Sequence, residues 1–450
     1  MKGKYTTRRR FLKTAAVPAP LVVAAQVVSR GAGAAPSDRV AVGFIGAGGR
    51  ALSWRQPKLM VETAGMSNAR IVAVAEADRQ RLAAGKAFVD KAYGNADCAT
   101  YADFRELLDR KDIDAVFVAT PHHWHGVMTV MACQAGKDVY SEKPLSLTIR
   151  EAVRMAEAAK QYSRIVQGGT QARSSPTISY AVQAIRDGKI GGVKTVQVGC
   201  WGQARSMEVT PEPVPEYLDW DMYVGPAKMC PYSSKVRWGA RKEFSGGAIT
   251  DWGHHFFDVA QWGLSMDESG PVQVFPAGGD HEFVTLRYAS GAEIQLHAKG
   301  GRALSTGTTF IGNQGKIYTQ AWEDYVEFEP KELGIQYLKE RKLEVPEGLS
   351  ADQKALAVQI DGTVPPKERD DFSDNGTGLH IANFLDCVRT RTMSNADVQL
   401  SRRSVTLAHL VNISLWTNRR LRWDPERFEF PGDDEANGFL HIEPRAPWKL

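Results

Sequence analysis

A short apolar strand near the start of the chain runs directly into a glycine-rich turn. The predicted strand Val40 to Ile45 is followed by Gly46-Ala47-Gly48-Gly49-Arg50-Ala51, which has the spacing G-x-G-x-x-A. The missing side chains let a ligand approach the backbone, and the helix that follows offers free N–H groups and the positive end of its dipole. A second predicted strand ends in Glu76, where an acid can bind ribose hydroxyls. The segment therefore predicts a dinucleotide site at the first turn of a parallel sheet.

The elements around this turn divide the chain into two regions. From 39 to about 169, short β-branched runs alternate with stretches of helical spacing, which is typical of a parallel sheet with crossover helices. Later runs alternate sides, as in an antiparallel sheet with one covered face. We predict an α/β fold, with a doubly wound Rossmann sheet in 38–166 and an α+β substrate-binding and oligomerisation domain in 167–450 built on a large open, mostly antiparallel sheet. The clearest strands are Val40–Ile45, Ile71–Ala75, Ala115–Ala119, Asp138–Ser141, Lys194–Gly199, Glu282–Tyr288 and Glu293–His297, and the clearest helices are Tyr101–Asp109, Gly126–Ala135 and Ile149–Gln161.

The N-terminal residues have the pattern of an export signal. Thr7-Arg8-Arg9-Arg10-Phe11-Leu12-Lys13 precedes an apolar run, 15–28, that is short for a bilayer span, and small residues follow at 31–35. We interpret 1–35 as a cleavable twin-arginine signal, which makes the export machinery a partner and the periplasm or another extracytoplasmic space the destination. This route carries folded proteins, and no pool of free nucleotide is expected outside the cytoplasm. We therefore expect a tightly bound cofactor that is reduced and reoxidised without leaving the protein.

Composition excludes several other classes of protein. The net charge of +4 lies partly in the predicted signal, so the mature chain is near neutral, which argues against a nucleic-acid partner. Five widely spaced cysteines without C-x-x-C argue against a metal cluster or a disulfide scaffold. No later segment has eighteen consecutive apolar residues, so we expect no membrane span in the mature protein. Loops rich in Trp, Tyr and Pro at 201–238 are compatible with a sugar site or with simple packing.

Several motifs together resemble the Gfo/Idh/MocA family of oxidoreductases. They are Ala119-Thr120-Pro121 with His125, then 135–139 (AGKDV), then Glu142-Lys143-Pro144, and finally 246–258 (GGAITDWGHHFFD), in which His255 follows Asp251 by four residues. The match covers nearly all of the mature chain. The resemblance implies an NAD(P)-dependent enzyme that acts on a small carbohydrate and assembles as a homo-oligomer, a dimer or a tetramer.

The resemblance also implies roles for individual residues. Lys143 is the catalytic lysine that hydrogen-bonds the reacting oxygen, and the bond before Pro144 is expected to be cis. His255 suits a general base, with Asp251 holding its tautomer or binding a hydroxyl. Substrate contacts are expected at Gln171, Arg173 and His254, with hinge hydrogen bonds as an equal alternative for the first two. The predicted cofactor-binding residues are Gly46, Gly48, Gly49, Arg50, Glu76, Thr120, Pro121, Trp124, His125, Glu142 and Lys143.

Two further questions concern the ligands: whether the cofactor is NAD or NADP, and whether a metal ion is bound. An acid at Glu76 repels a 2′-phosphate, which favours NAD, whereas the nearby Arg79 leaves NADP open. The sequence 122–125 (HHWH) holds three histidines and raises the question of a metal. Neighbours in extended or turn geometry at a strand end rarely converge on one ion, and no acidic ligand lies beside them, so we expect no metal site.

Three interpretations of the activity remain open at this point. The first is an oxidoreductase that oxidises one carbohydrate and reduces another with its own nucleotide. The second is redox-neutral glycoside cleavage through a 3-keto sugar, as in the NAD-dependent α-N-acetylgalactosaminidases of the same superfamily, although their pattern differs where Glu142-Lys143-Pro144 stands here. The third is a non-catalytic sugar or nucleotide sensor, against which Lys143 and His255 argue. We favour the first.

Overall fold

The computed structural model describes residues 39–450 except 54–57, 236, 300–301, 304 and 335–375. The predicted export signal, 1–35, lies outside these described residues. Within them, no helix is both long and apolar enough to cross a membrane.

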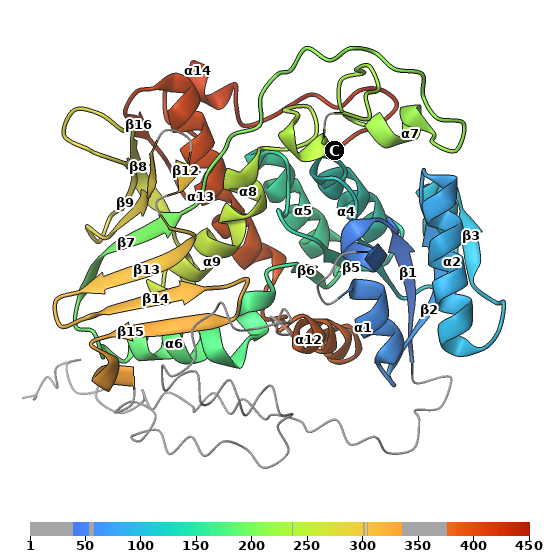
Figure 1. Cartoon of the computed structure of the whole chain (residues 1–450), viewed down its shortest axis with the longest axis horizontal. Helices are drawn as coiled ribbons and strands as arrows, with labels where there is room; N and C mark the ends of the chain where they lie inside the picture. Colours follow the sequence, from blue (N-terminus) through green and yellow to red (C-terminus); the bar gives the residue numbers. More distant parts are fainter. Residues whose placement is uncertain (1–38, 54–57, 236, 300–301, 304, 335–375) are drawn as a thin grey trace, which may run out of the picture. The chain divides into compact units, whose positions relative to one another are not determined.

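Six strands pair in parallel in the first region of the chain, in the order β3-β2-β1-β4-β5-β6. The strand order reverses between β1 and β4, which is the switch point where doubly wound sheets bind ligands. The predicted Rossmann sheet is therefore confirmed (Figure 1). The strands are β1 Val40–Ile45, β2 Ala69–Ala75, β3 Ala99–Tyr101, β4 Ala115–Val118, β5 Asp138–Ser141 and β6 Val166–Gly168, and the crossover helices are α1 Leu59–Gly65, α2 Arg79–Tyr93, α3 Phe104–Asp109, α4 His125–Gln134 and α5 Ile149–Gln161.

Local chemistry sets where these helices begin. The Asp78 side chain caps α2 by accepting from the N–H groups of Gln80 and Arg81. The expected helix Tyr101–Asp109 begins only at Phe104, because Tyr101 pairs with β2 and Asp103 caps the helix. A second difference follows the glycine turn. There a five-residue π-helical turn, η2 Gly49–Ser53, stands where we expected a regular helix to begin.

The second sheet has eight strands in the order β15-β14-β13-β7-β10-β9-β8-β16. Every pair is antiparallel except β10 with β7, which confirms the mostly antiparallel sheet. Buried side chains of α6, α9 and α13 share its core, so these helices cover one face (Figure 1). The strands are β7 Val193–Gly199, β8 Pro271–Phe275, β9 Val284–Tyr288, β10 Glu293–Leu296, β13 Gly307–Gly312, β14 Lys316–Gln320, β15 Tyr325–Glu329 and β16 Leu421–Arg422. The small ribbon β11 Ala298–Lys299 and β12 Arg302–Ala303, and the helices α6 Pro176–Arg186, α7 Trp220–Val224, α8 Ala248–Asp251, α9 Gly253–Gly263, α12 Thr377–Thr390, α13 Val398–Thr417 and α14 Asp434–Asn437, complete the elements.

A buried ion pair ties the end of the parallel sheet to the helices of the second region. Arg173, in the 3-10 turn η4 (Gln171–Ser174) after β6, donates from Nε to both oxygens of Asp258 in α9, each at 2.9 Å. Arg173 Nη2 reaches Asp267 at 2.7 Å, and Ser404 of α13 donates to Asp258 at 2.6 Å. Of the two interpretations of Arg173, these contacts favour hydrogen bonding at the junction over substrate binding.

Replacing Arg173 by Met should lower the thermal unfolding midpoint by about 5 °C, because it leaves Asp258 buried without its cation, a loss of about 3–5 kcal/mol. Differential scanning fluorimetry measures this. The control is Arg427→Met, which removes an ion pair whose arginine side chain is 75% exposed and should leave the midpoint nearly unchanged. Equal midpoints for the two variants would show that the Arg173 pair does not stabilise the junction.

Candidate active site

A cleft lies at the carboxyl ends of β1 and β4, at the switch point of the parallel sheet. Its volume is about 350 Å³, within the range of small-molecule sites. It is lined by residues of the glycine turn, of the ends of β2, β4 and β5, of the helices α2, α3 and α4, and of the loops that carry α7 and α8. Among them are Gly46, Gly48, Gly49, Arg50, Glu76, Arg81, Phe104, Thr120, Pro121, His122, Trp124, Glu142, Lys143, Met222, Tyr223, Trp238 and Asp251.

The glycine turn has the geometry that a dinucleotide requires. Gly46 has φ +97°, and a Cβ there would lie 2.6 Å from the carbonyl oxygen of Ala119, so only glycine fits between β1 and β4. A Cβ at Gly48 would meet only the guanidinium of Arg81, at 3.5 Å, so this backbone is open to the cleft. Ala51, the third position of the fingerprint, is fully buried. The turn thus fits the pyrophosphate role predicted for it.

Glu76 lies beside this turn with one backbone donor on each carboxylate oxygen. Ala47 N–H donates at 2.9 Å and Asp78 N–H at 3.2 Å. Burial raises the pKa of Glu76, against the lowering effect of these donors. Two arginines follow Glu76 in the sequence and point to different places. Arg79 donates to the carbonyl of Glu216, whereas Arg81 lines the cleft.

Glu142 links the glycine turn to the loop after β5. Its Oε1 accepts from Arg50 Nε at 2.9 Å and from Gln171 Nε2 at 3.0 Å. Gln171 also donates to the Tyr140 hydroxyl at 2.9 Å. The structure therefore places the predicted substrate residue Gln171 behind Glu142, and it does not line the cleft.

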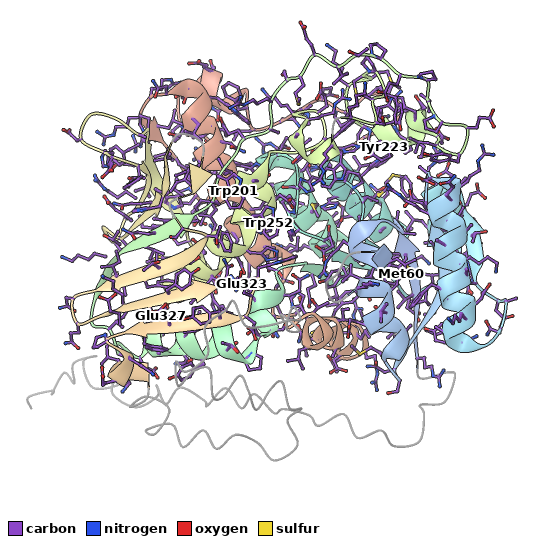
Figure 2. All side chains as sticks on the ribbon, in the orientation of Figure 1. Met60, Trp201, Tyr223, Trp252, Glu323 and Glu327 are labelled. Carbon is purple, nitrogen blue, oxygen red and sulfur yellow. The ribbon has the colours of Figure 1, made fainter. Side chains whose placement is uncertain are left out.

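An ion pair between Lys143 and Asp251 stands at one end of the cleft. Lys143 Nζ donates to Asp251 Oδ1 at 2.8 Å and to the Asp251 carbonyl at 3.1 Å. The rings of Trp252 and Trp322 lie 5.4 and 5.6 Å from the same nitrogen; Trp252 is labelled in Figure 2. Burial alone would raise the pKa of Asp251, but the Lys143 ammonium and the His122 contact hold it below its ordinary value. The Lys143–Pro144 bond is cis, as expected.

The two histidines that follow Asp251 do not line this cleft. His255 is buried against the ring of Trp322, with ring centroids 5.6 Å apart, and the same ring lies 5.6 Å from Lys143 Nζ. Burial, and then the charge of Lys143, lowers the pKa of His255 well below 6.5, so the ring is a neutral base. His254 is fully buried, and its Nδ1 accepts from Leu145 N–H at 3.4 Å, so it supports the segment that carries Lys143.

Residues 122–124 form a 3-10 turn and His125 is the first residue of α4. The ring nitrogens of the three histidines contact different partners. His123 Nε2 and Trp124 Nε1 both donate to the Tyr223 carbonyl, at 3.0 and 3.1 Å. His125 lies between the carbonyls of Thr120 and Pro144 and does not line the cleft. His122 alone faces the Lys143–Asp251 pair, with Nε2 3.5 Å from Asp251 Oδ1. His122 is not among the predicted site residues, and its signals in the sequence are its place directly after Pro121 and the histidine run 122–125.

Known proteins resemble this chain in sequence over part of its length. Inositol 2-dehydrogenase 1 of Saccharopolyspora erythraea is 35% identical over 130 residues, which is 29% of this chain and 37% of that protein. A glycosyl hydrolase family 109 protein of Shewanella pealeana is 30% identical over 174 residues, 34% of this chain and 37% of that protein. Each alignment thus spans well under half of the relative.

A solved structure shares the fold. The aldose-aldose oxidoreductase of Caulobacter crescentus, complexed with glycerol, aligns with a TM-score of 0.56 at 17% identity and covers 85% of this chain and 99% of that one.

Two family profiles together match most of the chain. The profile described as "Oxidoreductase family, NAD-binding Rossmann fold" matches residues 40–170. The profile described as "Oxidoreductase family, C-terminal alpha/beta domain" matches 195–357 and 360–450. With the switch-point cleft and its glycine turn, these matches establish that the chain belongs to the Gfo/Idh/MocA family of oxidoreductases.

Proposed function

We propose that the chain is an exported NAD(P)-dependent oxidoreductase that oxidises a sugar, polyol or glycoside at a carbon bearing a hydroxyl, with a tightly bound, recycling cofactor. The observation that carries this proposal is the Lys143–Asp251 ion pair at the end of a dinucleotide-shaped cleft. Support for a carbohydrate substrate comes from relatives named for inositol and levoglucosan.

The residues of the cleft have distinct tasks in this proposal. The glycine turn and Glu76 would hold the nucleotide, and the buried acid favours NAD, with Arg81 as the cation that leaves NADP open. When bound, the nicotinamide takes up the hydride that the substrate carbon loses. The Lys143 ammonium hydrogen-bonds the substrate oxygen, and Asp251 keeps that ammonium in place. His255, a neutral base, receives the hydroxyl proton; because it does not line the cleft, this role requires the site to rearrange around Trp322 when substrate binds.

Lys143→Ala and His255→Ala should each lower kcat by about 10²-fold or more, because each removes a proton-handling group, while the purified protein keeps its nucleotide. Steady-state kinetics and nucleotide quantification measure both effects. Because burial lowers the pKa of His255, it stays neutral as the pH falls, so kcat/KM should be retained below pH 6.5. Lys316→Ala, at an exposed ion pair with Glu329, is the control. Near-normal kcat in either site variant would refute its role.

We also propose that a clasp, residues 217–225 and 445–448, retains the cofactor. Residues 217–219 pair with the chain after β2, through Arg79 N–H to Tyr217 O at 2.8 Å and Asp219 N–H to Ala77 O at 3.0 Å. Beyond them, α7 brings Met222 and Tyr223 to the cleft. Tyr223 is labelled in Figure 2. Entry or release of a nucleotide past these side chains requires the clasp to move.

The last residues of the chain fasten the clasp. Arg445 donates to the Gly225 carbonyl at 2.9 Å and to the Asp221 carboxylate at 2.8 Å. Trp448 packs on Phe104 and Trp124, which both line the cleft. The C-terminus accordingly ends beside the loop that carries α7 (Figure 1).

Arg445→Ala combined with Trp448→Ala should speed release of bound nucleotide by about tenfold or more, because the charge-assisted hydrogen bonds that fasten the clasp are lost. Stopped-flow displacement of NADH, followed by its fluorescence, measures the rate. Arg154→Ala, at an exposed pair with Glu157, should release nucleotide at the wild-type rate. An unchanged rate in the double variant would refute retention by the clasp.

We propose export by the twin-arginine route, with the mature protein in the periplasm or a similar compartment. The support is the motif 7–13 and the apolar run after it. Mass spectrometry of the N-terminus of secreted protein tests this, and a chain that stays in the cytoplasm with Met1 intact would contradict it.

Redox-neutral glycoside cleavage is the second candidate, favoured by the sequence likeness to family 109 glycosyl hydrolases. In that reaction, oxidation at C3 acidifies the C2 hydrogen, a base removes it, and the C1 substituent leaves; water then adds, and the hydride returns to C3. Incubating an aryl glycoside with the protein in deuterated water, without added nucleotide, separates the two candidates. Oxidation alone predicts an intact glycoside or about one equivalent of keto-sugar, whereas cleavage predicts free aglycone and deuterium at C2.

A further inference from the structure

His122 is a buried histidine at the Lys143–Asp251 pair that the proposed mechanism does not use. It lies in the 3-10 turn after β4, is 2% exposed, and lines the cleft. Its Nε2 lies 3.5 Å from Asp251 Oδ1, the same oxygen that accepts from Lys143 at 2.8 Å. One carboxylate oxygen therefore faces two nitrogen groups, which come from the loops after β4 and β5.

The surroundings of the imidazole decide which nitrogen carries its proton. His122 Nδ1 is buried and has no hydrogen-bond partner among the described residues. A buried N–H without an acceptor is costlier and rarer than an unpaired lone pair, so the proton belongs on Nε2, which faces Asp251. Burial, as the largest cause, lowers the pKa of His122, which keeps the ring neutral and its single N–H on that side. The edge-to-face contact with Trp238, at 4.6 Å between centroids, holds the ring orientation.

The other oxygen of Asp251 remains available to a ligand. Lys143 and His122 both contact Oδ1, and no described residue donates to Oδ2. The Asp251 side chain is 28% exposed and lines the cleft. With Oδ1 held from two sides, rotation of the carboxylate about its last bond is restricted, and Oδ2 is presented to whatever occupies the cleft beside Lys143.

We infer that His122 is a positioning residue of the proposed oxidoreductase site, which fixes the Asp251 carboxylate so that Lys143 and Asp251 Oδ2 address the substrate hydroxyl together. This inference rests on the proposed function and adds to it a residue outside the Lys143, Asp251 and His255 set. The role is geometric: His122 donates one hydrogen bond and takes no proton from the substrate.

The test is single-turnover reduction of the bound nucleotide by a sugar substrate, followed by nicotinamide absorbance in the purified holoenzyme. His122→Phe keeps a ring against Trp238 but removes the donor, so the rate should fall about tenfold to a hundredfold. The sugar KM and the nucleotide content should stay within about twofold, because the lost interaction acts on the reacting geometry. His122→Gln restores an N–H that reaches Asp251 and should recover most of the rate. His281→Phe, in the loop between β8 and β9, is the control for a histidine-to-phenylalanine change.

Each outcome decides the inference. The inference would be overturned if His122→Phe reduced its nucleotide as fast as the wild type, or if His122→Gln were as slow as His122→Phe. A loss of rate that a higher KM or missing nucleotide explains would also overturn it. If His122→Phe does not fold, His122→Gln is compared with His122→Asn, because the shorter Asn side chain places its amide farther from Asp251. Equal rates for these two variants would overturn the role. If none of the carbohydrates tested reduces the nucleotide of the wild-type protein, the proposed function itself is refuted. If the wild type is active and His122→Phe is equally active, only the role of His122 is refuted.

Discussion

The ion pair between Lys143 and Asp251 joins segments 108 residues apart and organises the site around it. Lys143 follows β5 of the parallel sheet, and Asp251 ends α8, just before the helix that packs on the second sheet. Attraction between such charges grows where water is excluded, and removing either partner leaves the other charge poorly solvated. The pair thus positions a cation and a carboxylate at the cleft and also links the two sheets at that point.

At the nucleotide end of the cleft, the decisive feature is the absence of side chains at the glycines. Gly46 passes between β1 and the end of β4 where no Cβ fits, and Gly48 leaves backbone open to the cleft. Met222 and Tyr223 of the clasp line the same cleft as these glycines. At Gly225, φ is +49° and a Cβ would lie 2.0 Å from the Trp124 ring, so the clasp packs directly on a residue of the cleft wall. The proposed clasp and the predicted export signal support the same proposal, a cofactor that stays with the protein.

Features of the site that depend on local sequence were predictable. The strand before the glycine turn and the helix Ile149–Gln161 have local signals, and the structure confirms them. The cis bond before Pro144, which the family resemblance implied, is confirmed as well. Contacts between distant segments were not predictable. No spacing rule places Arg445 on Asp221, His122 on Asp251 or Trp322 against His255, because each pair joins segments far apart in the chain. Arg173 was ambiguous for the same reason, since Asp258 and Asp267 lie far along the chain.

The most direct measurement is the nucleotide content of the purified protein and its response to sugar. The protein would be isolated without added nucleotide, mixed with a set of aldoses, polyols and glycosides, and denatured, and the released nucleotide would be quantified in both redox states. Our account predicts close to one nucleotide per chain, with the oxidised form converted to the reduced form by at least one carbohydrate. Protein that emerges free of nucleotide, or whose nucleotide no carbohydrate reduces, would contradict it.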